Sequence, residues 1–134
     1  MRVDGKVVGT CGQGLLVMVA VAPNDDHETA LWLARKLAGL RIFNDEEGRM
    51  NRSVVDVEGN ALVISQFTLY GNCRKGRRPS FVRSAHPDIA EPLYRRFCEL
   101  LEAAGVPAQQ GVFGADMKVS LVNDGPVTLL VDSP

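Results

Sequence analysis

The feature that most restricts the fold of this chain is an unbroken apolar run at residues 14–22, which reads GLLVMVAVA. The run is stopped by Pro23, and its length and valine content are typical of a strand. A strand without polar alternation is typical of a sheet that is covered on both sides. The run therefore predicts a strand that is buried on both faces.

Two later patterns have helical periodicity. Asp25 and Glu28 have the spacing of a capping box, and the apolar residues after them predict a helix over residues 26–39 that ends near Gly39. A second helix is expected to begin near residues 89–92, because Pro92 has no N–H to donate, and to end at Gly105. The apolar faces consist of Ala30, Leu33, Ala34, Leu37 and Ala38 in the first helix, and of Leu93, Phe97, Leu100, Leu101 and Ala104 in the second.

The remaining segments predict a sheet. Residues 61–69 form the strand ALVISQFTL after a hairpin-like turn, whereas residues 54–57 form either a short strand or an extended segment. Three short strands complete the chain at about 108–113, 116–122 and 127–132. This order predicts one mixed α/β domain over residues 1–134, with a strongly curved, barrel-like sheet and both main helices packed on one face.

Composition excludes several classes of protein. No apolar run reaches the length of a bilayer span, and the start, MRVDG, has no signal-peptide pattern, so we expect a cytoplasmic protein that binds no membrane. Cys11, Cys73 and Cys98 are widely spaced, and His27 and His86 stand alone. The sequence therefore predicts no disulfide, no metal site and no cofactor.

Positive charge is concentrated in one loop. The net charge is −1, yet five of the fifteen basic residues lie within the ten positions RKGRRPSFVR. This pattern is typical of a protein that meets a polyanion at a single place. A loop whose charges are only solvated has the same composition, so both interpretations stay open. Arg74, Lys75, Arg77 and Arg78 are the candidate phosphate contacts.

Two further segments are candidate sites. SQFTLYG at residues 65–71 brings Ser65, Gln66 and Thr68 to a strand end, which either lines a cleft or frays in solvent. NDGPVT at residues 123–128 reads first as a tight turn. A Gly-Pro bond, however, adopts the cis form at only about 0.5–1 kcal/mol above trans, and a cis bond would turn two successive carbonyl groups the same way.

Together, SQFTL and NxGPVT resemble the two signature motifs of D-aminoacyl-tRNA deacylases, the family first described for D-tyrosyl-tRNA. The similarity continues, in the order of that family, through GLLVMVAV, LARKLAGLRIFNDEEGRMNRSV, RKGRRPSF and FGADMKVSLVNDGPVT, and covers essentially the whole chain. The resemblance implies the fold of that family and a homodimer. It also implies hydrolysis of the ester between a D-amino acid and the 3′ end of tRNA, a quality-control step of translation.

The resemblance implies roles for particular residues. Ser65, Gln66, Phe67 and Thr68 form the catalytic segment, in which backbone amides around Phe67 and Thr68 hold the oxyanion and the terminal 2′-hydroxyl of the tRNA assists the water. Thr68 is the weaker candidate for a nucleophile, because no base adjoins it.

Chirality is read by a second set of residues in this family. Gly125 and Pro126, joined by a cis bond, enter the pocket of the partner subunit, hold the α-amino group of a D-substrate and exclude an L side chain. Glycyl-tRNA, which has no side chain to exclude, is expected to be hydrolysed as well. Phe113 and Met117 line the site of the terminal adenosine, unless they only pack in the core.

One departure from the family keeps other functions open. Family members normally start with an additional strand of the type MRAVVQRV, whose arginine braces the Gly-Pro motif, and its absence leaves a sheet edge unpaired. The first alternative is a truncated, inactive paralogue that acts as an RNA-binding dimer. The others are a non-catalytic RNA-binding module, which has no use for a cis Gly-Pro, and an esterase that uses Ser65 or Thr68 as nucleophile.

Overall fold

The computed structural model describes residues 1–134 and contains two long helices and three separate sheets. In the central sheet, three parallel strands lie in the order β3-β6-β7, with bounds Gly14–Val19, Asn60–Ser65 and Ala108–Gln110. Parallel neighbours need a long crossover connection. Helix α1 (His27–Gly39) lies in the connection from β3 to β6, and α2 (Pro87–Ala103) lies in the connection from β6 to β7.

The strand that was expected to be buried on both faces lies at an edge of this sheet. β3 has a neighbouring strand on one side only, and Met18 within it is 40% exposed. The prediction of full burial is therefore wrong for β3. The central strand is β6, in which residues 61–64 are all buried. An apolar run alone does not distinguish the two positions, because both strands contact the helices.

Helix α1 confirms the prediction for residues 26–39, although a different pair of residues caps it. Asp26 accepts a hydrogen bond from the N–H of Thr29 at 3.1 Å, and the Thr29 hydroxyl accepts one from the N–H of Asp26 at 2.8 Å. The predicted capping box of Asp25 and Glu28 is wrong. The Asp25 carboxylate instead accepts from the N–H of Ala22 at 2.8 Å, in the turn before the helix.

Helix α2 begins earlier than the sequence predicts. The ring of His86 caps it by accepting from the N–H of Asp88 at 3.2 Å, and Pro87 occupies the first turn, where no N–H is needed. Pro92 therefore lies inside the helix and not at its start. The predicted end is confirmed, because Gly105 follows the helix in a left-handed conformation with φ +97°.

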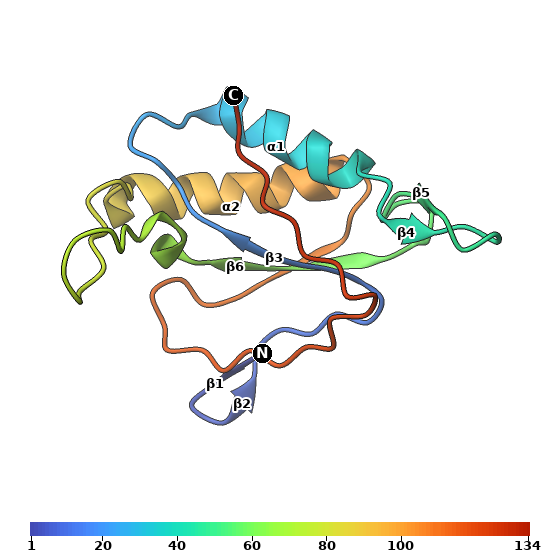
Figure 1. Ribbon diagram of the computed structural model, residues 1–134, viewed down its shortest axis with the longest axis horizontal. Helices are drawn as coiled ribbons and strands as arrows, with labels where there is room; N and C mark the ends of the chain where they lie inside the picture. The colour runs from blue at the N-terminus through green and yellow to red at the C-terminus, as the bar shows by residue number, and fades with distance from the viewer.

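Both helices pack on the same face of the central sheet, as the sequence predicts (Figure 1). The core between these layers includes Ala34 and Ala38 of α1, Tyr94, Phe97 and Leu101 of α2, and Val63 of β6. A smaller cluster of Met1, Leu62 and Ile64 lies outside this core. Neither helix combines the length and the apolar character that a bilayer span requires.

The sheet does not close into a barrel, so that part of the prediction is wrong. The other strands form two small hairpins, β1 (Arg2–Val3) with β2 (Lys6–Val7) and β4 (Phe43–Asn44) with β5 (Met50–Arg52). Of the three final strands only the first forms, as β7. Residues 116–122 keep one bridge, from Lys118 to Arg2, residues 127–132 form no strand, and residues 54–57 form a turn. Beyond that bridge, the N–H and C=O groups of the last segments pair with no strand of this chain.

Candidate functional site

The predicted polar segment lies at the carboxyl end of the central strand. β6 ends at Ser65, and Phe67–Tyr70 form a 3-10 turn in place of the second half of the predicted strand 61–69. Pairing with β3 stops here because Val19 is the last residue of that strand, and its carbonyl accepts from the N–H of Gln66 at 2.7 Å. The turn leaves Phe67 and Thr68 exposed at this end of the sheet.

The N–H groups of Phe67 and Thr68 are without an acceptor. The first N–H groups of a 3-10 turn have no partner within the turn. The side chain of Gln66 does not cap them, and none of the hydrogen bonds of the loops and caps uses them. Two adjacent free N–H groups can bind a developing oxyanion. The structure therefore brings together the donors that the sequence resemblance implies.

No base accompanies these amides. The hydroxyl of Thr68 accepts from Nε2 of Gln66 at 3.0 Å, and this amide does not take up a proton. Nδ1 of His27 accepts from Arg96 and Nδ1 of His86 accepts from the N–H of Asp88, and no hydrogen bond joins either histidine to Thr68. Burial raises the pKa of the nearby Tyr70 hydroxyl, which keeps it protonated. The segment thus lacks the base that activates a hydroxyl nucleophile.

The second motif forms an exposed loop of defined shape. The Gly125–Pro126 peptide bond is cis. The side-chain oxygen of Asn123 accepts from the N–H of Val127 at 2.9 Å, and its nitrogen donates to the hydroxyl of Thr128 at 2.8 Å. Gly125 has φ +135°, and a Cβ there would lie 2.8 Å from the side chain of Val127. No sequence pattern had indicated these roles for Asn123 and Thr128.

The structure does not bring the two motifs together within one chain. Figure 1 shows the dark red segment that carries residues 123–128 near the beginning of β6, whereas the Phe67–Tyr70 turn follows the end of that strand. β6 has six residues, a length of about 20 Å. The segment that carries Gly125 and Pro126 therefore lies away from the Phe67–Tyr70 turn of the same chain, and no hydrogen bond joins the two.

Phe113 and Met117 lie in the segment after β7 and pack against different parts of the core. The Phe113 ring is half-buried, with its centroid 6.0 Å from that of Tyr94. Met117 packs against the smaller cluster that contains Ile64. Both side chains therefore contribute to packing in the single chain, Phe113 against the main core and Met117 against the smaller cluster.

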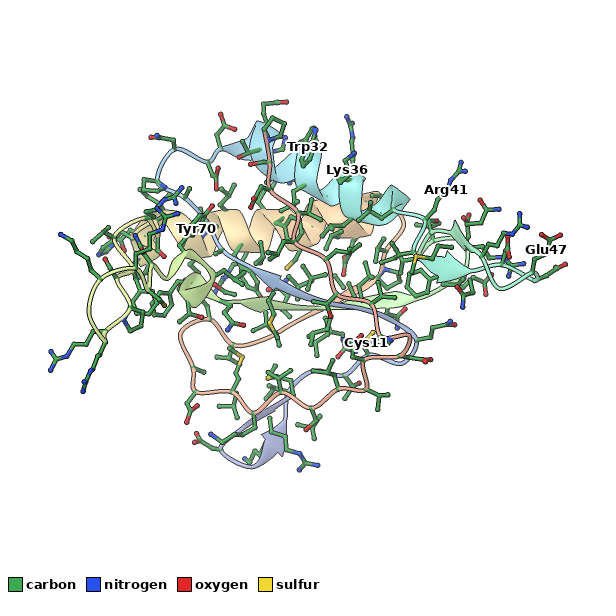
Figure 2. All side chains as sticks on the ribbon, in the orientation of Figure 1. Cys11, Trp32, Lys36, Arg41, Glu47 and Tyr70 are labelled. Atoms are coloured by element: carbon green, nitrogen blue, oxygen red, sulfur yellow. The ribbon has the colours of Figure 1, made fainter.

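The basic loop is closed at its base and free of acidic partners. Asn72 and Ser80 exchange two backbone hydrogen bonds of 2.8 and 2.9 Å, and Gly76 in the loop has φ +64°. The four predicted phosphate contacts, Arg74, Lys75, Arg77 and Arg78, are all exposed, and none of the ion pairs in the structure includes them. Figure 2 shows the side chains of this loop projecting into solvent on the side of Tyr70.

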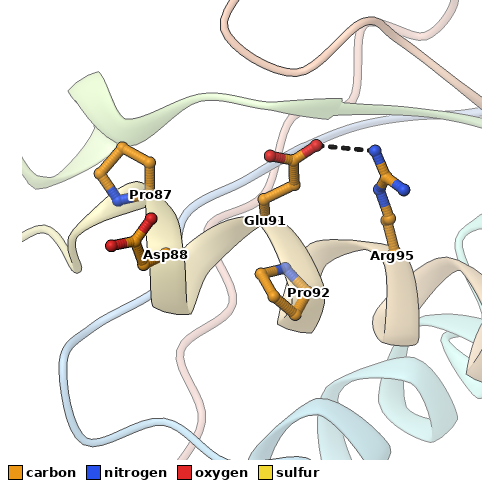
Figure 3. A pocket seen from close by; sticks show the side chains of 5 residues that line it. All are labelled: Pro87, Asp88, Glu91, Pro92 and Arg95. Atoms are coloured by element: carbon orange, nitrogen blue, oxygen red, sulfur yellow. Dashed lines mark hydrogen bonds and ion pairs between the residues drawn. The ribbon is translucent and has the colours of Figure 1, made fainter.

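A hollow of about 500 Å³ lies elsewhere, on α2, and is lined by Pro87, Asp88, Glu91, Pro92 and Arg95. Within it, Arg95 donates to Glu91 at 2.7 Å (Figure 3). It contains none of the predicted site residues and no free N–H pair, so we do not assign it as the active site.

No group of three His, Cys, Asp or Glu side chains lies close enough to hold a metal ion.

Comparisons with known proteins show the family of the chain. Residues 1–132 match the family described as D-Tyr-tRNA(Tyr) deacylase. A protein of Thermomicrobium roseum named D-aminoacyl-tRNA deacylase is 60% identical over 133 residues, which cover 99% of this chain and 86% of the relative. A protein of the same name from Geobacter sulfurreducens is 55% identical, with coverage of 99% and 88%.

A solved structure has the same fold as this chain. It is described as a c-Myc DNA unwinding element binding protein, is 35% identical and superposes with a TM-score of 0.92 over 99% of this chain and 91% of its own. The match of the family over nearly the whole chain, with both motifs in place, decides the assignment. The chain belongs to the D-Tyr-tRNA(Tyr) deacylase family.

Proposed function

We propose that the protein hydrolyses the ester that joins a D-amino acid to the 3′ end of tRNA. The observation that carries this proposal is the pair of free N–H groups of Phe67 and Thr68, with no base beside them. The vicinal hydroxyl of the ribose already activates an ester of this kind, so an oxyanion site is needed more than a strong nucleophile. The names of the relatives at 60% and 55% identity support the same substrate class.

In the proposed reaction, water attacks the carbonyl carbon of the ester and the carbonyl oxygen takes the negative charge. The N–H groups of Phe67 and Thr68 bind this oxygen, and losing one such donor typically costs about 2.7–4 kcal/mol. The free 2′-hydroxyl of the terminal nucleotide assists the water. The bond to the ribose oxygen then breaks, and that oxygen takes a proton, which releases the free D-amino acid and the tRNA.

Selection between D- and L-amino acids is assigned to a second copy of the chain. Because the segment that carries Gly125 and Pro126 lies away from the Phe67–Tyr70 turn of its own chain, a symmetric partner has to supply them. The partner's Gly125 and Pro126 hold the α-amino group of a D-substrate through their carbonyl groups and leave no room for an L side chain. The glycyl group has no side chain to exclude, so glycyl-tRNA is hydrolysed as well.

Exposed apolar side chains support a homodimer. Val122 is 90% and Leu130 is 89% exposed, and Leu121 and Leu129 are each more than half exposed. These residues flank the Gly125–Pro126 loop, and a monomer rarely leaves so much apolar surface in one segment. Sedimentation should show a dimer at micromolar concentration. A monomer that keeps full activity would exclude the cross-subunit arrangement.

The remaining tRNA contacts are proposed from charge and position. Arg74, Lys75, Arg77 and Arg78 bind phosphates of the acceptor stem, because no carboxylate of the chain neutralises them. Phe113 and Met117 contact the terminal adenosine from the segment after β7. Aminoacyl-tRNA is used in the cytoplasm, so we place the reaction there.

The alternative is an inactive paralogue that binds RNA as a dimer, and turnover separates the two functions. Purified protein is mixed with an excess of D-Tyr-tRNA, and both binding and release of D-tyrosine are measured. We expect many turnovers per subunit. Tight binding without release of D-tyrosine would favour the inactive paralogue and refute the proposal.

A further inference from the structure

The residues that follow the basic loop hold Phe67 in two ways. The hydroxyl of Ser84 donates a hydrogen bond of 3.0 Å to the carbonyl oxygen of Phe67. The ring of Phe81 meets the ring of Phe67 edge to face, with centroids 5.1 Å apart and planes at 74°. Phe67 is 56% exposed, so the ring of Phe81 covers only part of it. We call residues 81–85 the brace.

The brace is itself anchored at both ends. Ser80, just before it, is paired with Asn72 through two backbone hydrogen bonds, and Ala85 donates its N–H to the carbonyl of Val21 at 2.8 Å. A turn bond of 3.0 Å joins the N–H of Ser84 to the carbonyl of Phe81. The brace therefore connects the end of β3 and the base of the basic loop to the Phe67–Tyr70 turn.

A glycine allows the ring of Phe81 to reach this position. A Cβ at Gly71 would lie 3.0 Å from the Phe81 ring and 2.9 Å from the carbonyl oxygen of Thr68. The ring thus fits between Phe67 at the start of the 3-10 turn and Gly71 at its end. The ring therefore contacts the turn at its two ends.

The hydrogen bond from Ser84 acts on one particular peptide group. The carbonyl of Phe67 and the N–H of Thr68 belong to the same planar, trans unit and point in opposite directions. A donor fixed on the carbonyl oxygen therefore fixes the direction of the Thr68 N–H. The same bond polarises the peptide, which makes the N–H a stronger donor.

We propose that Ser84 and Phe81 are positioning residues of the oxyanion site. They hold the peptide between Phe67 and Thr68 so that its N–H points at the developing oxyanion, and they do not touch the substrate. This inference rests on the proposed role of that N–H. Because the charge develops only in the transition state, removal of the Ser84 hydroxyl lowers kcat and leaves KM unchanged.

The test uses an isosteric pair at position 84. Ser84→Thr keeps the hydroxyl and Ser84→Val does not, while the two side chains have nearly the same volume. We expect wild-type kcat for Ser84→Thr, and a kcat reduced roughly threefold to tenfold for Ser84→Val with unchanged KM for D-Tyr-tRNA. Ser80→Ala is the control, because its hydroxyl makes no hydrogen bond in the structure and it lies just outside the brace.

Two stable analogues provide a readout that a change in packing alone would not produce. One carries a tetrahedral, anionic phosphonate in place of the ester, and the other carries an uncleavable amide. We expect Ser84→Val and Phe81→Leu to weaken phosphonate binding by the same factor by which they reduce kcat, and to leave amide binding unchanged. Equal effects on both analogues, or none on either, would overturn the inference. An inactive wild-type protein would instead contradict the proposed function itself.

Discussion

The hydroxyl of Tyr94 donates a hydrogen bond of 2.6 Å to the carbonyl oxygen of Val63 in the central strand. The N–H of Gly111 donates to both groups, to the Tyr94 hydroxyl at 3.2 Å and to the carbonyl oxygen of Val63 at 3.0 Å. Tyr94 is buried in α2, so this contact fixes the helix to the sheet where β7 ends. The proposed catalytic segment begins only a short distance further along β6, at Ser65.

This buried contact predicts a loss of stability at alkaline pH. Burial raises the pKa of Tyr94 from 10.0 to about 12 and that of Cys98 from 9.0 to about 11. Both neutral forms are favoured in the folded state, so their contribution is complete below pH 9 and is lost as the pH rises through 11 and 12.

Urea unfolding at pH 8.5 and at pH 11.5 measures this contribution. We expect the free energy of unfolding of the wild type to fall more steeply with pH than that of Tyr94→Phe, which has no hydroxyl to ionise. Tyr70→Phe is the comparison: burial raises the pKa of Tyr70 as well, but Tyr70 is less buried, so we expect a smaller change in the slope. The same slope in the wild type and in Tyr94→Phe would show that Tyr94 ionises without a penalty.

Gly125 predicts a change in selectivity. A Cβ at this residue would clash with the side chain of Val127. In addition, Gly125 has a φ of +135°, which an L-residue rarely adopts, so Gly125→Ala distorts the loop. We expect a lower rate on D-Tyr-tRNA and a smaller ratio of D- to L-rates, with the fold retained. Gly48→Ala is the matched control, because Gly48 also has a positive φ but lies in open space. If both variants keep the wild-type ratio, the loop has no part in selection.

The basic loop predicts a change in salt dependence. We expect the replacement of Arg74, Lys75, Arg77 and Arg78 by glutamine to weaken binding of all tRNAs alike. The slope of log K against log salt should fall by about 0.9 for each phosphate that the loop no longer neutralises. A variant with Lys36→Gln and Arg41→Gln, both outside the loop (Figure 2), should bind as the wild type does. Unchanged affinity of the loop variant at low salt would mean that the loop is only solvated.

The side chain of Thr68 is predicted to be dispensable. Thr68→Ala removes the hydrogen bond with Gln66 but keeps the backbone N–H, so we expect kcat to fall by less than about tenfold. Loss of a true nucleophile can cost about 10⁶-fold. Intact-mass spectrometry of the wild type during turnover provides the complementary measurement. An acyl adduct on Thr68 or Ser65 would favour the alternative function, an esterase with one of these residues as nucleophile.

Local signals in the sequence predicted the parts of the fold that depend on neighbours in the chain. The spacing of the alanines predicted α1, and Gly105 predicted the end of α2, because both depend on interactions within a few residues. The start of α2 was predicted too late, because the cap that His86 supplies outweighs the missing N–H of Pro92. The N-cap of α1 was predicted at Asp25 but is Asp26, because Asp26 forms the capping box with Thr29.

Interactions between distant segments could not be predicted in this way. Whether residues 67–69 continue a strand depends on β3, which ends at Val19. Residues 127–132 have a strand-like sequence but pair with no strand of this chain, and residues 116–122 pair with β1 only at Lys118. At the proposed site, the motifs indicated Phe67, Thr68, Gly125 and Pro126, and their roles stay predictions. No sequence pattern indicated that Ser84 donates to Phe67, because that hydrogen bond depends on the fold of the intervening loop.

The central claim is that this protein hydrolyses D-aminoacyl esters and rejects L-aminoacyl esters of the same tRNA. The most direct measurement is kcat/KM for D-Tyr-tRNA and for L-Tyr-tRNA, prepared on one tRNA and assayed with the purified chain. A backbone that excludes the L side chain predicts a ratio of at least about 100, equivalent to roughly 2.7 kcal/mol. Equal hydrolysis of the two esters, or preference for the L-ester, would contradict the claim.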